Sequence, residues 1–159
     1  MKKPFRTRRR MAGVSMVEAL VAVVIISVGM LGIAGMYLAS LQAGRSANLR
    51  VQALNLTTDL ADRIRANRSG LVNYQVASDG LGKEHDCQTV SCTAKDLAEN
   101  DLFLWKRAIS AALPANANGR VTFTDNAAPA PDRYTIVVTW REPNSDVDAT
   151  NTMIVESEP

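Results

Sequence analysis

A single carboxylate, Glu18, interrupts the start of a long apolar run. A basic leader ends at Gly13, and the 23 residues from Ala19 to Leu41 carry no charge. An ionised side chain inside an apolar membrane segment costs about 2.5–3.5 kcal/mol, so it normally has a partner or a function. Cleavage after Gly13 would give Val14 a positively charged α-amino group, four residues before Glu18 and on the same helical face. The spacing predicts an ion pair within one chain, or between axially offset neighbouring helices whose register it would fix.

Two cysteines, Cys87 and Cys92, enclose four residues. In an exported domain we expect them to form a disulfide, which would contribute on the order of 2–3 kcal/mol because the loop is short. The alternative is a metal site that combines both cysteines with His85. That pattern supplies only three ligands, so we expect no metal and no cofactor.

The residues needed for catalysis are scarce. His85 is the only histidine, and any Ser/His/Asp or Cys/His arrangement would have to be built on it. No phosphate-binding loop, zinc-protease motif or dinucleotide-binding fingerprint occurs. The sequence therefore predicts a protein that is not an enzyme. An enzyme would need a pocket that gathers several scattered polar residues, and its activity would fall when His85 is replaced.

Charge is unevenly distributed along the chain. Residues 1–13 hold six of the 18 basic residues and no acid, which leaves 12 basic against 16 acidic residues, a net charge of −4, in the remainder. The basic end is expected to stay in the cytoplasm while the C-terminal part is exported. The negative remainder argues against a nucleic-acid partner, because phosphate binding needs surplus Lys and Arg.

The apolar run, as a helix, is roughly 35 Å long and can cross a bilayer. We expect three segments: a leader that is removed (1–13), a hydrophobic transmembrane and assembly helix (14–41), and a periplasmic globular domain (42–159). A plain membrane anchor and a cleaved secretory signal are the alternatives, but the apolar part of a secretory signal is usually only 7–15 residues long.

One helix is expected from about residue 15 to residue 67. Its second half carries an apolar stripe with spacings of three and four that would form the spine of the globular domain: Leu49, Ala53, Leu56, Leu60 and Ile64. Three glycines recur in its first half, Gly29, Gly32 and Gly35. They are interpreted either as sites of close helix packing or as sites of helix flexibility, because each glycine costs about 1 kcal/mol relative to alanine.

The C-terminal half predicts a second helix and a small sheet. Thr93 with Asp96 indicates a helix start, and Pro114 a helix end. Residues 69–91 are polar and glycine-containing, which predicts a loop. Alternation from 121 to 124 and from 134 to 140, and a run at 152–156, indicate strands. The expected fold is α+β: a long N-terminal helix packed against an antiparallel sheet of three or four strands.

The leader, Gly13, the apolar run and Glu18 as the fifth residue after Gly13 together resemble the class III signal of type IV pilins and type II secretion pseudopilins. The resemblance implies that a prepilin peptidase cleaves after Gly13 and methylates the amine of Val14. This sequence departs from the class III signal in one respect, because the family most often has Phe or Met where Val14 stands. Major pilins often carry Pro where Gly35 stands, and their helix melts nearby, so Gly35 could allow a milder version.

Two further runs, 59–67 with 41–45 before it and 101–114, are similar to the PilV-type minor pilins. This resemblance implies a type IV pilin-like fold and a subunit that moves from the inner membrane, with its domain periplasmic, to the pilus on the cell surface. Its partners would be other minor pilins, the major pilin and a tip adhesin, in support of pilus assembly, twitching motility and adhesion. The alternatives are a pseudopilin of a type II secretion system and an unprocessed bitopic protein with a periplasmic binding domain.

Overall fold

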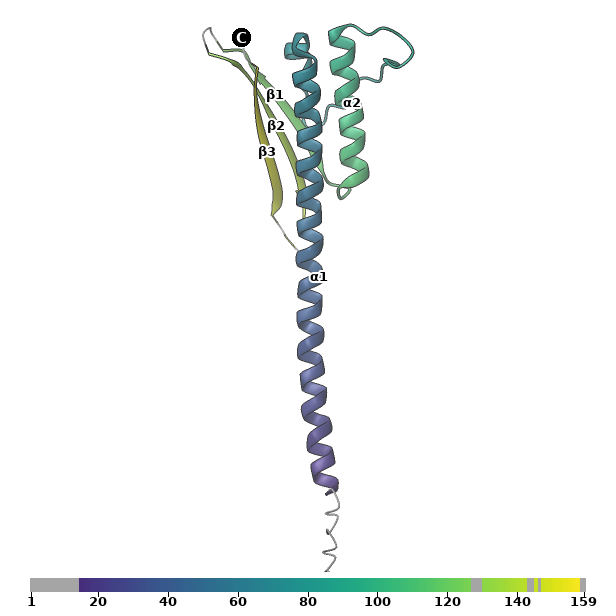
Figure 1. The fold of residues 1–159 in the computed structure, drawn as a ribbon, viewed down its shortest axis with the longest axis vertical. Helices are drawn as coiled ribbons and strands as arrows, with labels where there is room; N and C mark the ends of the chain where they lie inside the picture. Colours follow the sequence, from purple (N-terminus) through teal and green to yellow (C-terminus); the bar gives the residue numbers. More distant parts are fainter. Residues whose placement is uncertain (1–14, 127–129, 143–144, 146, 158–159) are drawn as a thin grey trace, which may run out of the picture. The chain divides into compact units, whose positions relative to one another are not determined.

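The computed structural model describes residues 15–126, 130–142, 145 and 147–157. The chain divides into two compact units, Met1–Leu41 and Gln42–Pro159. Helix α1 (Met16–Ala66) begins in the first unit and ends in the second (Figure 1). The expected helix from about residue 15 to residue 67 is therefore confirmed.

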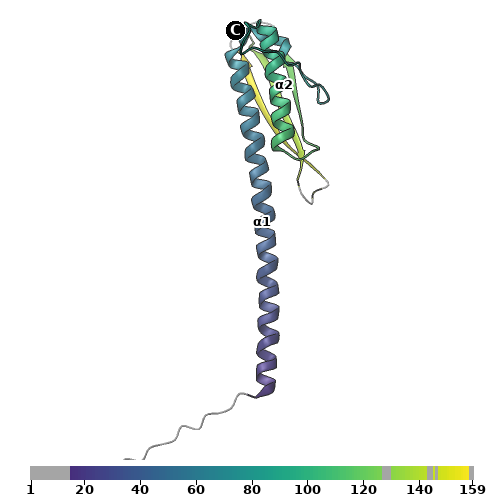
Figure 2. The same cartoon turned by 90° about the vertical axis from the view of Figure 1, so that its right-hand side faces the viewer.

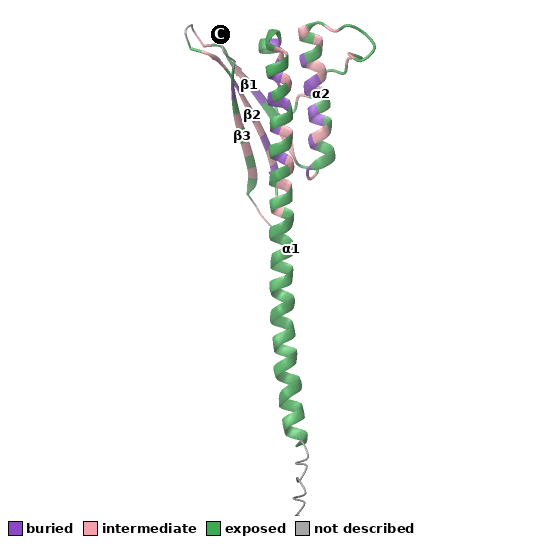
Figure 3. Cartoon of the chain, in the orientation of Figure 1, coloured by how far each residue is buried: buried purple, intermediate pink, exposed green. Residues whose placement is uncertain are grey.

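In the first unit, α1 is helical without a break through Gly29, Gly32 and Gly35. Every described residue of this unit is exposed (Figure 3). Among the described residues, α1 is the one helix long and apolar enough to cross a membrane, and none of its apolar window is buried within the chain.

The second unit contains the end of α1, a 3-10 helix η1 (Arg68–Tyr74), helix α2 (Ala94–Ala112) and three strands. These strands are β1 (Asn118–Thr124), β2 (Asp132–Arg141) and β3 (Asp148–Ser157). They form an antiparallel sheet in the order β1-β2-β3. Figures 1 and 2 show the two helices running alongside the sheet. The predicted α+β fold is confirmed.

The core lies between the helices and one face of the sheet. From β2 it takes the alternate residues Tyr134, Ile136, Val138 and Trp140, each at most 2 % exposed. The stripe of α1 supplies Ala53, Leu60 and Ile64, with Leu49 and Leu56 packed at its margin. From α2 it takes Leu102, Trp105 and Ile109. The periodicity of three and four in α1 and of two in β2 therefore correctly identified the buried faces.

Helix α2 begins at a capping box. The Thr93 hydroxyl accepts a hydrogen bond from the Asp96 backbone N–H, and the Asp96 carboxylate accepts one from the Thr93 backbone N–H. The helix ends at Ala112, two residues before Pro114. Both predicted ends are confirmed to within two residues.

The prediction of a loop over 69–91 was wrong at its start. Residues 68–74 form η1, which is interrupted at Leu71, where φ is +43°. Further along, Val76 exchanges two backbone hydrogen bonds with Val121, of 3.0 and 2.9 Å. This bridge occupies part of the outer edge of β1. Among the described residues no strand pairs with the outer edge of β3.

Candidate assembly segment and disulfide loop

The carboxylate of Glu18 lies in the first turn of α1 and is exposed. Within the part of the chain that the structure describes, no side chain forms an ion pair with it. Gly13 and Val14 lie outside the described residues, so cleavage, methylation and the amine–carboxylate pair stay predictions.

The helix around Glu18 exposes large apolar side chains in every direction. Examples are Leu20 at 66 %, Ile25 at 66 % and Leu31 at 73 % exposure. Burying such a side chain fully is worth about 1.5–3 kcal/mol, so a helix of this kind is stable only inside lipid or against other apolar helices. The segment therefore requires an apolar environment, which the described residues of this chain do not provide.

The three glycines of this segment are not required by packing within the chain. A Cβ added at Gly29, Gly32 or Gly35 would meet nothing within 4 Å. Close packing against a neighbouring helix and local flexibility both remain predictions for these positions.

The charged residues at the end of α1 form ion pairs along the helix. The Arg65 guanidinium lies 2.7 Å from the Asp62 carboxylate, and that of Arg63 lies 2.9 Å from Asp59. Arg63 also reaches across to α2, where it donates a hydrogen bond of 3.0 Å to Asp101. The two runs that resemble PilV-type pilins thus contact each other at this pair.

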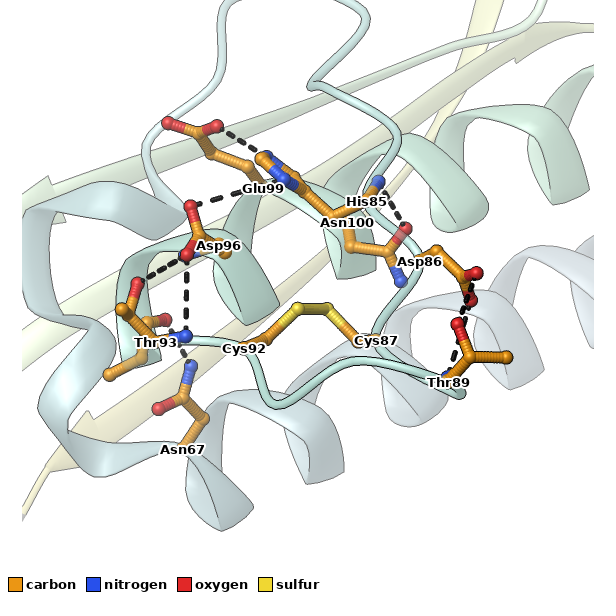
Figure 4. Close-up of a disulfide and its surroundings, with 11 residues drawn as sticks. Asn67, His85, Asp86, Cys87, Thr89, Cys92, Thr93, Asp96, Glu99 and Asn100 are labelled. Atoms are coloured by element: carbon orange, nitrogen blue, oxygen red, sulfur yellow. Dashed lines mark hydrogen bonds and ion pairs between the residues drawn. A yellow bond between two sulfur atoms is a disulfide. The ribbon is translucent and has the colours of Figure 1, made fainter.

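Cys87 and Cys92 form a disulfide that closes a short loop before α2 (Figure 4). Within the loop, the Thr89 hydroxyl donates a hydrogen bond to the Asp86 carboxylate. This bond lowers the pKa of Asp86. Because both sulfur atoms are used in the disulfide, the alternative of a metal site built on the two cysteines with His85 is wrong for this oxidised form.

The chain before the disulfide lies directly on α2. Gly82 has a φ of +69°, and a Cβ there would come within 2.7 Å of the Phe103 backbone nitrogen. Next to it, the Lys83 N–H donates a 3.3 Å hydrogen bond to the Glu99 carbonyl. The His85 N–H donates a 3.0 Å bond to the Asn100 side chain. Glycine at 82 is therefore needed both for the backbone angle and for this close approach.

His85 is placed between two carboxylates of α2 (Figure 4). Its Nε2 lies 2.9 Å from Glu99 Oε2, and its Nδ1 lies 3.9 Å from Asp96 Oδ1. The contact with His85 lowers the pKa of Glu99, while the hydrogen bond from Thr93 lowers the pKa of Asp96. Sequence reasoning missed this group. The i,i+3 spacing of Asp96 and Glu99 was the available signal, but nothing in the sequence places His85 opposite them.

A cavity of about 350 Å³ borders Lys106, which is only 7 % exposed. Its ammonium donates hydrogen bonds to the carbonyls of Ala77 and Ser78 and to the Asn118 side chain, at 2.8–3.1 Å. Burial lowers the pKa of Lys106. Since all three ammonium N–H groups already have acceptors, this lysine secures the backbone beside η1 and β1 and offers no free donor to a substrate.

Two family models match the chain in adjoining segments. The model described as prokaryotic N-terminal methylation motif matches residues 8–34, and the model described as type IV pilin Tt1218 matches residues 35–103. No curated protein and no solved structure matches. Residues 8–103 are therefore similar to type IV pilins, a family of structural rather than enzymatic proteins, and the α+β fold is consistent with this similarity.

Proposed function

We propose that this pilin-like chain is a minor pilin of the PilV type that helps to initiate assembly of a type IV pilus. One observation carries the proposal. The N-terminal methylation motif over residues 8–34 leads into a helix whose apolar side chains are exposed throughout the described part of the first unit. Such a helix needs an apolar environment, which the inner membrane supplies before assembly and neighbouring subunits supply afterwards.

The proposed sequence of events begins with cleavage after Gly13 by a prepilin peptidase and methylation of the new amine on Val14. Residues 14–41 then anchor the subunit in the inner membrane, with residues 42–159 in the periplasm. On entry into the filament, the Val14 amine and the Glu18 carboxylate pair with groups of opposite charge on neighbouring helices. Because an ion pair inside an apolar medium is far more favourable than an unpaired charge, it selects one axial position.

The PilV subtype and a position at or near the pilus tip rest on the two runs at 59–67 and 101–114. The contact between Arg63 and Asp101 supports reading these runs as one structural unit. In this role the subunit acts with other minor pilins and the major pilin, could carry an adhesin at the tip, and supports twitching motility and adhesion.

A pseudopilin of a type II secretion system is the second candidate, because it would carry the same N-terminal motif. Deletion of the gene in the native host separates the two. A pilin mutant is expected to lose surface pili and twitching while secreting its exoproteins normally. A pseudopilin mutant is expected to keep its surface pili and twitching and to lose secretion of its exoproteins.

The experiment that tests the proposal is intact mass and N-terminal sequencing of the protein from membranes of its native host. We expect a chain that begins at N-methylated Val14. A chain that still begins at Met1 would identify an unprocessed bitopic protein and would overturn both the cleavage and the proposed role of Glu18.

Gly13 is predicted to be essential for processing. Gly13→Ala adds a methyl group at the residue before the cut and is expected to leave most of the protein uncleaved. Ala12→Ser, one residue earlier, is the matched control and is expected to be cleaved normally. Immunoblotting for the precursor and the mature form measures the effect, and efficient cleavage of Gly13→Ala would contradict the assigned site.

A further inference from the structure

We propose that His85, Asp96 and Glu99 form a binding site for Zn²⁺ or a chemically similar divalent transition-metal ion. One imidazole nitrogen and two carboxylate oxygens are ligand atoms that Zn²⁺ accepts in proteins. Here one such atom from each residue lies within 4.8 Å of the others. The site is remote in sequence from the methylation motif, and the proposal does not depend on the pilin function.

The distances are close to those of a bound ion. Zinc bonds to nitrogen and oxygen are about 2.1 Å long and point to the corners of a tetrahedron, so ligand atoms around one ion are about 3.4 Å apart. The three ligand atoms lie within 4.8 Å of one another. Pairs of them would therefore close by up to about 1.4 Å through side-chain rotation of Glu99 or His85. Asp96 and Glu99 are three residues apart on α2 and so lie on one face of the helix.

Carboxylates lie on both sides of the His85 ring. Its Nε2 lies 2.9 Å from Glu99 and its Nδ1 lies 3.9 Å from Asp96. An imidazole binds one metal ion through one ring nitrogen, so the ion would take either Nε2 beside Glu99 or Nδ1 beside Asp96, and the other carboxylate would reach it by side-chain rotation. There the ion would also neutralise the two carboxylates.

The ligand atoms are held in place and left available by their surroundings. Asp96 uses Oδ2 for its bonds with Thr93, which leaves Oδ1 toward His85. Lys95 approaches Glu99 at Oε1, at 3.8 Å, which leaves Oε2. The backbone of His85 is fixed by Asn100, and the disulfide begins two residues later.

Two lysines limit the affinity that we expect. Lys95 pairs with Glu99, and Lys83 also acts electrostatically on Asp96 and Glu99. Their positive charge opposes a dication, so micromolar rather than nanomolar binding is expected. A bound ion would fasten the segment before the disulfide to α2, and three protein ligands would leave a fourth position for water or a partner's side chain.

The test uses the full chain in detergent, purified without a polyhistidine tag and with its disulfide verified by mass. His85 is the only histidine and the structure contains no free cysteine, so imidazole binding has one source. Zinc chloride is titrated by calorimetry, and the His85 ring signals are followed by NMR at constant pH. We expect one saturable ion per chain, shifted ring signals and a raised unfolding temperature.

The variants His85→Gln and Glu99→Gln are expected to weaken zinc binding by about tenfold or more. Glu84→Gln, an exposed acid beside His85 but outside the group, is the matched control and should bind normally. Circular dichroism checks that each variant is folded. Ring signals that respond to pH but not to zinc would show a proton site only. Zinc binding that is unchanged in His85→Gln would place the ion elsewhere. Either result overturns the proposal.

Discussion

Arg63 binds two carboxylates that differ chiefly in exposure. The side chain of Asp59, one turn away on α1, is 53 % exposed, whereas that of Asp101 on α2 is 8 % exposed. Asp101 also accepts a 2.8 Å hydrogen bond from the Tyr74 hydroxyl. Burial, with a smaller contribution from this bond, raises the pKa of Tyr74. Asp101 on α2 therefore accepts hydrogen bonds from the charged Arg63 on α1 and from the neutral Tyr74 on η1, and so connects the three helices.

Replacement of Asp101 by alanine is predicted to destabilise the second unit by about 2–3 kcal/mol. It removes the nearer of the two acceptors of the Tyr74 hydroxyl and leaves one side of Arg63 without an acceptor. Asp59→Ala is the matched control and should cost less than about 1 kcal/mol, since an exposed pair contributes little. Urea unfolding followed by tryptophan fluorescence measures both. Equal effects of the two substitutions would contradict the role given to Asp101.

Glu142 gives the second unit a predicted pH dependence. The Arg50 guanidinium, 2.8 Å away, lowers the pKa of Glu142 in the folded protein. A carboxyl whose folded pKa is depressed stabilises the fold above its unfolded pKa of about 4.3, and this contribution is lost as the pH falls through the lower folded pKa.

The expected outcome is that Glu142→Gln lowers the unfolding temperature at pH 7, and that its difference from the unmodified protein shrinks toward zero as the pH falls below 4. Thermal melting between pH 3 and pH 7 tests this. In an Arg50→Gln background, Glu142→Gln should change the pH profile less, with a smaller effect left from the hydrogen bond of Ser46 to Glu142. A difference that persists at pH 3 would show that the substitution acts through packing instead.

At the scale of elements, β1 and α2 approach each other closely at Gly119. A Cβ there would lie 2.5 Å from Trp105 Cη2 and 2.5 Å from Ile109 Cδ1. Both neighbours are at most 2 % exposed, so neither can move into solvent. The absence of a side chain at Gly119 therefore sets the distance between this helix and the sheet.

Gly119→Ala is predicted to destabilise the protein by about 1–3 kcal/mol, the usual cost of overpacking a core. Gly44→Ala provides the control, because nothing lies within 4 Å of a Cβ at that helical position. It should be neutral or stabilising by up to about 1 kcal/mol. The two unfolding free energies should move in opposite directions or differ by at least 1 kcal/mol; a Gly119→Ala protein as stable as Gly44→Ala would be inconsistent with the packing described.

Elements with a repeated pattern could be predicted from the sequence, because burial on one face imposes its period on the residues. The stripe of α1, the alternation of β2 and the capping box of α2 are of this kind. The full length of β3 could not be predicted. Its first residues, 148–151, are mostly polar, and they are held by pairing with 138–141 of β2 rather than by an apolar pattern of their own.

Contacts between distant segments could not be predicted either, because no local sequence pattern encodes them. The bridge from Val76 to Val121 and the burial of Lys106 depend on where η1 places the chain, and η1 itself includes a leucine at positive φ that no propensity favours. The disulfide was predictable from two cysteines in one domain that the sequence predicts to be exported. The neighbours of His85 were not, because they are separated from it by the disulfide loop.

At the scale of the whole molecule, the two units differ in whether they bury their own apolar side chains. The second unit buries its own core, whereas every described residue of the first unit is exposed. Glu18 is the one charged residue within α1 before Arg45. In the proposed filament, its carboxylate is the feature that distinguishes one axial position of the helix from another.

Glu18→Ala is predicted to leave cleavage intact and to reduce incorporation into filaments, because the proposed partner of the Val14 amine is lost. Ser15→Ala, in the same turn, is the control and should be incorporated normally. The amount of the subunit in sheared pili, relative to the amount in membranes, is the measurement. Normal incorporation of Glu18→Ala would falsify the pairing.

In the proposed function, the exposed apolar helix also makes this subunit a solute that is shared between two immiscible phases, the lipid and the interior of the fibre. Its distribution follows a partition coefficient, which is set by the difference between two large transfer free energies of similar origin. Removing a methyl group from Ile25 or Leu31 would reduce both free energies together, so their difference would change little. A charge that is solvated differently in the two phases changes this difference directly. Among the residues of this helix, Glu18 therefore has the greatest leverage on which phase the subunit occupies.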